Sequence, residues 1–119
     1  MPGWNLVLRI LLEMAALVGI VLGGRELIDG ATGQLVGIAA AIAAAAAWGT
    51  FNVPGDPSRS GRAPVPVSGL VRLCVEFDVL AVGGAGWLLA APGIGIVFLA
   101  LVAAHYAAST RRLRWLLSR

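Results

Sequence analysis

The chain has 119 residues, of which 59% are hydrophobic and only 13% are charged, and its formal net charge is +3. A water-soluble domain has about 45–50% apolar and about 25% charged residues, so this composition excludes a soluble enzyme with its own core and also excludes intrinsic disorder. The basic residues are nine arginines in short segments between apolar runs, which is typical of a membrane topology signal and not of nucleic-acid binding.

Four apolar stretches are long enough to cross a membrane as helices, which takes about 20 residues. They are residues 6–24, 34–51, 70–90 and 93–110. The helix of the fourth stretch can continue through the amphipathic segment 111–117. We therefore predict an all-α integral membrane protein, a four-helix transmembrane bundle that forms a single domain over residues 1–119.

The three connections differ in character. Residues 25–33 form a short polar turn in which Gly30 is expected to end a helix. Residues 52–68 contain four prolines, so they are predicted to be a flexible, solvated cytoplasmic loop. The Ala-Pro-Gly sequence at residues 91–93 predicts a tight hairpin between the third and fourth helices.

The arginines indicate the orientation of the chain. If all four stretches cross, the side that holds both termini and the middle loop has eight arginines, Arg59 and Arg62 among them. The other side has only Arg25, beside Glu26 and Asp29. Because arginine is enriched in cytoplasmic segments, we predict that both termini lie in the cytoplasm.

Ionisable residues occur inside the predicted spans, where charges are costly and usually face a bundle interior. They are Arg9, Glu13, Arg72, Glu76, Asp78 and His105. With a rise of about 1.5 Å per residue, Glu13, Glu76 and His105 lie roughly 9–10 Å from the same side. One interpretation is structural, because Arg9–Glu13 and Arg72–Glu76 are i,i+4 neighbours that can neutralise each other. The other is an ion or proton site, or a pocket for anionic lipid head groups.

Two of these residues raise separate questions. Asp78 has no arginine one turn away and lies about 160–200° around the helix from Glu76, which predicts a helix surrounded by protein or a subunit interface. His105 could ligate haem or a metal, but it has no second ligand in the sequence, so a hydrogen-bonded histidine is expected. We expect no metal and no cofactor.

Glycine spacing predicts close helix packing. Gly19 and Gly23 in the first stretch, and Gly33 and Gly37 in the second, match the small-xxx-small pattern that lets helix backbones approach closely. Residues 83–86 add three glycines in the third stretch. The half of the bundle away from the termini is therefore predicted to be tightly packed.

A short pattern occurs twice in the chain. Residues 8–13 and 71–76 both read apolar, Arg, three apolar, Glu, at an offset of 63 residues. The chain is either a tandem pair of helical hairpins in parallel orientation or a low-complexity sequence in which the match is coincidental.

Two segments resemble the YrdB family of small bacterial four-span proteins, also known as the DUF2568 domain. The first is residues 8–17, with Arg9 and Glu13, and the second is residues 48–54, which begin with Trp-Gly and end with Pro54. The resemblance covers nearly the whole chain, although the fourth stretch has His105 and Tyr106 where the family often has an asparagine. The resemblance implies a bacterial inner-membrane location, and it implies no particular activity.

No motif of soluble catalysis is visible, such as a P-loop, GxSxG or HExxH. We expect a scaffold, an accessory subunit or a lipid-binding module rather than an enzyme. Its expected partners are membrane lipids, including anionic ones, and either copies of itself or another membrane protein, but no nucleic acid. One alternative is a small homo-oligomeric transporter or channel with a protonatable layer near the cytoplasm. A more remote alternative is a haem- or quinone-associated subunit.

Overall fold

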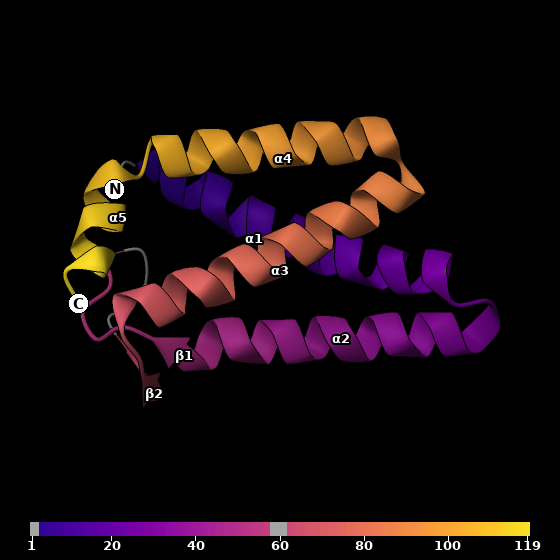
Figure 1. Cartoon of the computed structure of the whole chain (residues 1–119), viewed down its shortest axis with the longest axis horizontal. Helices are drawn as coiled ribbons and strands as arrows, with labels where there is room; N and C mark the ends of the chain where they lie inside the picture. The colour runs from indigo at the N-terminus through magenta and orange to yellow at the C-terminus, as the bar shows by residue number, and fades with distance from the viewer. Residues whose placement is uncertain (1–2, 58–61) are drawn as a thin grey trace.

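The computed structural model describes residues 3–57 and 62–119 of the chain. Figure 1 shows α1 behind α3 at the centre of the molecule, with α2 along one side and α4 along the other. Both ends of the chain lie at one end of the bundle, beside α5 and two short strands (Figure 1). The elements in chain order are α1 (Gly3–Leu27), α2 (Gly30–Thr50), β1 (Phe51–Asn52), β2 (Val65–Pro66), α3 (Gly69–Ala90), α4 (Pro92–Ala107) and α5 (Thr110–Leu117).

The all-helical class is confirmed, and the long helices cover the four apolar stretches. Among the residues that the structure describes, three helices are long and apolar enough to cross a membrane, and the bent pair α4–α5 makes a fourth if it counts as one span. This is compatible with a multi-pass membrane protein. The tandem repeat of hairpins stays a prediction.

The predicted continuation of the fourth helix is wrong, because the chain bends by 70° between α4 and α5. The hydroxyl of Ser109 donates to the carbonyl of His105, and its amide donates to the carbonyl of Tyr106. These bonds tighten the last turn of α4, and a serine that bonds back to the preceding turn bends helices. As a result, α5 crosses the end of the bundle instead of extending α4 (Figure 1).

Two tight turns join the antiparallel helices. Gly30 begins α2 rather than ending α1, and its φ of 73° lies in the left-handed region that glycine adopts without a steric cost. Pro92 occupies the first turn of α4, where a missing backbone N–H leaves no hydrogen bond unmade. The two turns set α2 against α1 and α4 against α3.

Glycines bring the backbones of neighbouring helices into contact. Gly19 and Gly23 of α1 face Gly86 of α3, and a methyl group added to Gly86 would overlap the backbone of Gly19. Gly37 of α2 faces the backbone of Val21 on α1, and Gly33 faces the backbones of Gly24 and of Ile28 in the following turn. The backbones of the three helices therefore approach closely at these glycines, and the indole N–H of Trp87 on α3 also reaches α1, where it donates to the carbonyl of Ala15.

The long helices bury several charged side chains beside an apolar core and expose many large apolar ones. Arg9, Arg72 and Glu76 are at most 4% exposed, whereas many large apolar side chains of the four long helices are exposed, among them Leu11 at 60% and Leu35 at 66%. Helices surrounded by lipid are expected to bury their charged side chains and to expose apolar ones.

Part of the predicted solvated loop packs against the bundle. β1 and β2 pair in parallel, with Phe51 opposite Val65. Asn52 and Asp56 are buried, and Asp56 is ion-paired with Arg112 of α5. Arg59, which contributed to the predicted orientation, lies outside the described residues.

Candidate functional site

The buried carboxylate of Glu76 is the centre of the site, at the end of the bundle that carries α5. Its Oε1 accepts hydrogen bonds from Arg9 Nη1 (3.1 Å), Arg112 Nη1 (3.0 Å) and the hydroxyl of Tyr106 (2.7 Å). Its Oε2 accepts from Arg9 Nη2 (2.9 Å), Arg72 Nε (2.7 Å) and Arg112 Nη2 (2.6 Å). One carboxylate thus binds three guanidinium groups that come from three different helices.

Arg112 connects α5 with this centre and with the middle loop. Its Nε donates to Asp56 Oδ1 at 3.0 Å, and its Nη2 donates to Asp56 Oδ2 at 2.7 Å. Burial alone would lower the pKa of Arg112, but its hydrogen bonds with Glu76 and Asp56 raise that pKa above the ordinary value. We call the six side chains the Glu76 cluster: Arg9, Asp56, Arg72, Glu76, Tyr106 and Arg112.

The indole ring of Trp48 attaches the end of α2 to the cluster. The guanidinium carbons of Arg9 and Arg72 both lie 5.0 Å from the ring centroid, within the range of a cation–π contact. Arg72 Nη1 also donates to the carbonyls of Trp48 and Phe51, where α2 ends. A cation at the C-terminal carbonyls of a helix is stabilised by the helix dipole, so this contact stabilises the end of α2 against α3.

A second polar network joins α1 to the end of α4. Asn5 Nδ2 donates to Ser109 Oγ at 2.8 Å, and Asn5 Oδ1 lies 2.7 Å from His105 Nδ1. Because the Ser109 proton is used on the carbonyl of His105, the asparagine must donate to Ser109, and its oxygen accepts from His105 Nδ1. The Nε2 atom of His105 is buried and has no hydrogen-bond partner among the described residues.

Three of the predicted site residues meet in the cluster: Arg9, Arg72 and Glu76. The i,i+4 ion pair of Arg72 and Glu76 is confirmed, with a distance of 2.7 Å. Both terminal nitrogens of Arg9 bind Glu76 on α3, and its expected pairing with Glu13 stays a prediction. Glu13 itself is half-buried on α1 and is not without a partner.

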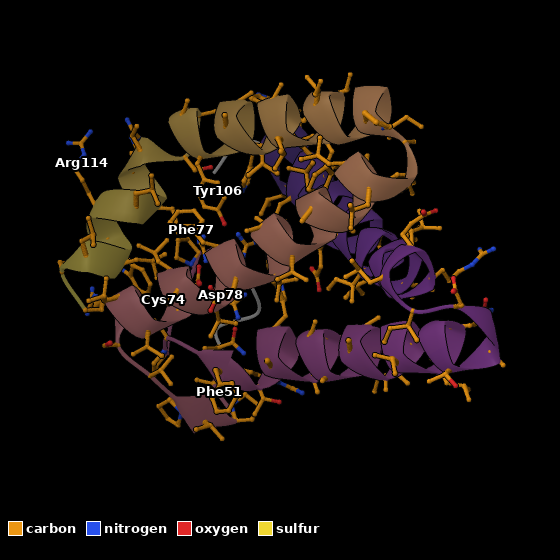
Figure 2. All side chains as sticks on the ribbon, turned by 45° about the vertical axis from the view of Figure 1, so that its right-hand side comes forward. Phe51, Cys74, Phe77, Asp78, Tyr106 and Arg114 are labelled. Atoms are coloured by element: carbon orange, nitrogen blue, oxygen red, sulfur yellow. The ribbon has the colours of Figure 1, made fainter. Side chains whose placement is uncertain are left out.

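His105 and Asp78 lie outside the cluster. The ring of His105 packs edge-on against Tyr106, with centroids 4.9 Å apart, so it adjoins the cluster without bonding to Glu76. Asp78 is exposed, and Figure 2 shows it on the side of α3 away from Phe77 and Tyr106. The structure therefore divides the predicted polar layer between the interior and one outer face of α3.

The sequence did not reveal several residues of the two networks. They are Asn5, Trp48, Asp56, Tyr106, Ser109 and Arg112. Asp56 comes from the loop that was predicted to be solvated and Arg112 from the predicted amphipathic extension of the fourth helix, and only the folded chain brings them together. The available signal was the spacing of Arg112 and Leu116, which places both on one face of a short helix.

The two faces of α5 differ. Arg112 and Leu116 are buried, whereas Arg111 and Arg114 are exposed, and Arg114 points away from the bundle in Figure 2. A cavity of about 540 Å³ adjoins the start of the helix; it is lined by Pro57, Ser109, Thr110, Arg111, Arg112 and Trp115, together with Ala108. This end of the molecule therefore presents arginines beside a cavity.

Comparison with known proteins relates the chain to proteins of unassigned activity. A family model described as "Protein of unknown function (DUF2568)" matches residues 7–104. The chain is 36% identical over 115 residues to "Uncharacterized protein YrdB" of Bacillus subtilis (strain 168), which covers 96% of this chain and 94% of that protein. No solved structure matches the chain. The family match includes Arg9, Arg72 and Glu76 and ends before Arg112.

Proposed function

We propose a function from the premise that the chain belongs to the DUF2568 family of proteins of unknown function. The protein is a non-enzymatic, multi-pass protein of the bacterial plasma membrane, and it binds anionic phospholipid head groups along α5. Both termini lie on the cytoplasmic side, and the Glu76 cluster holds α5 against the bundle end.

The exposed apolar helices and the charge distribution support the membrane location and the orientation. Among the described residues, the end that carries α5 has these exposed arginines: Arg62, Arg111, Arg114 and Arg119. The opposite end has exposed Arg25 beside Glu26 and Asp29. A cytoplasmic side rich in arginine and an outer side with mixed charge is the usual distribution.

The geometry of α5 carries the lipid proposal. The helix turns 70° away from α4 and exposes Arg111 and Arg114 on one face, one helical turn apart. Arg119 lies over the ring of Trp115 at 4.9 Å, beside the same surface. An amphipathic helix that lies along the membrane interface attracts anionic lipid through its arginines and buries its apolar face. Here the bundle fixes the helix in that position through Arg112.

Replacing Arg111 and Arg114 with glutamine is expected to weaken the binding of phosphatidylglycerol by roughly fivefold per arginine, because each arginine near a lipid surface contributes a similar electrostatic attraction. The measurement is the rise in the thermal unfolding midpoint of the protein in neutral detergent as phosphatidylglycerol is added. Both side chains are exposed, so the fold is expected to be unchanged.

The matched control is Arg25→Gln, which removes an exposed arginine from the opposite end. It is expected to leave the effect of phosphatidylglycerol unchanged, and phosphatidylcholine is expected to have little effect on any variant. An equal loss in Arg25→Gln, or equal stabilisation by the two lipids, would show that α5 is not the binding surface.

The Glu76 cluster supports a structural role better than a transport role. A proton that reaches Glu76 would have to displace donors from a carboxylate that already accepts six hydrogen bonds. We therefore assign the cluster to fixing α2, the middle loop and α5. A homo-oligomer or a second membrane protein as partner remains a prediction.

A further inference from the structure

Asp78 is a charged side chain on an apolar outer face. It follows Gly69 by nine residues, which at about 1.5 Å per residue places it roughly 13 Å along α3. Its side chain is exposed, and no residue that the structure describes lies within hydrogen-bond or ion-pair distance of its carboxylate. In a membrane-spanning helix such a carboxylate is costly unless a partner covers it.

An apolar groove begins at Val82, one helical turn beyond Asp78 on the same face of α3. The groove has a volume of about 210 Å³ and lies between α1, α2 and α3. Asp78 precedes Val82 by one turn, and the spacing from Asp78 through Val82 and Ala85 to Leu89 keeps all four residues on one helix face. The walls of the groove consist only of isoleucine, leucine, valine, alanine and glycine residues.

We infer that this groove binds an amphiphilic organic cation, with its hydrocarbon body between the helices and its positive group at the Asp78 carboxylate. Charge complementarity favours this occupant over a lipid acyl chain and over a second copy of the chain. The acyl chain of a lipid would fill the groove but leave Asp78 unpaired. A second copy related by a twofold axis along the membrane normal would place two Asp78 side chains at one depth, where like charges repel. The inference rests on the membrane location of α3 and not on the lipid surface of α5.

The experiment uses the whole chain in phosphatidylcholine nanodiscs, with octylammonium as the probe and equilibrium dialysis as the measurement. Saturable binding of one probe per chain is expected. Asp78→Asn is expected to weaken binding by about tenfold or more, because the ion pair forms in a water-poor environment. Val82→Trp fills the groove without changing the carboxylate, and it is expected to weaken binding as well. Asp29→Asn removes an exposed acid at the turn between α1 and α2, and it is expected to bind the probe normally.

Three outcomes would overturn the inference. The first is the absence of saturable binding, and the second is equal affinity of the Asp78→Asn and unmodified chains for the probe. The third, seen by native mass spectrometry, is that the unmodified chain is a dimer and Asp78→Asn is a monomer. The last result would assign this face to a second copy of the chain. None of them affects the test of α5, because the nanodiscs hold no anionic lipid and Arg111 and Arg114 are unchanged.

Discussion

Replacing Glu76 with glutamine is expected to lower the free energy of unfolding by about 3–5 kcal/mol, the range seen when one partner of a buried ion pair is removed. The substitution keeps the size of the side chain but removes its charge. Arg9, Arg72 and Arg112 would then remain buried with Asp56 as their one counter-ion in the cluster. The measurement is unfolding by sodium dodecyl sulfate in mixed micelles, followed by circular dichroism.

Glu26→Gln is the matched control, because it makes the same chemical change on an exposed side chain at the other end of the bundle. Its free energy of unfolding is expected to stay within about 0.5 kcal/mol of the unmodified chain. If Glu76→Gln were as stable as Glu26→Gln, the cluster would not hold the bundle together. A transport role for Glu76 would then become the better interpretation.

The second large effect is expected at the contact between α1 and α3. Gly86→Ala would place a methyl group against the backbone carbonyl of Gly19, and neither backbone can move without separating the two helices. Overpacking of this kind lowers the free energy of unfolding by about 1–3 kcal/mol. The same unfolding measurement in mixed micelles detects the loss.

Gly49→Ala tests the same substitution where space is available. Nothing lies within 4 Å of a methyl group at Gly49, so its stability is expected to be unchanged or raised by the better helix propensity of alanine. Equal stabilities of the Gly86→Ala and Gly49→Ala chains would mean that α1 and α3 do not pack through their glycines in solution.

The sequence predicts the helices well because each long helix is a continuous apolar stretch. It also predicts that Arg9, Arg72 and Glu76 are buried, since a charge inside an apolar stretch needs an interior partner, although Asp78 in the same stretch is exposed. The pair of Arg72 and Glu76 follows from helical spacing alone. These features depend on residues close together in the chain, so no knowledge of the folded structure is needed.

The remaining features depend on contacts between distant segments. Helical spacing alone makes Glu13 the neighbour of Arg9, but the crossing of α1 and α3 brings Glu76 into reach of both arginine nitrogens. The bend after Ala107 depends on how Ser109 bonds to the preceding turn, and it decides where Arg112 points. The spacing of residues in the sequence indicates neither how α1 crosses α3 nor where α4 bends, so only part of the Glu76 cluster could be predicted.

The measurement that tests the lipid-binding proposal most directly is native mass spectrometry of the chain released from nanodiscs that contain equal amounts of phosphatidylglycerol and phosphatidylcholine. The account predicts that the unmodified chain and Arg25→Gln retain phosphatidylglycerol in preference to phosphatidylcholine. The combined Arg111→Gln and Arg114→Gln variant is predicted to lose that preference. Equal retention of the two lipids by the unmodified chain, or an undiminished preference in the α5 variant, would contradict it.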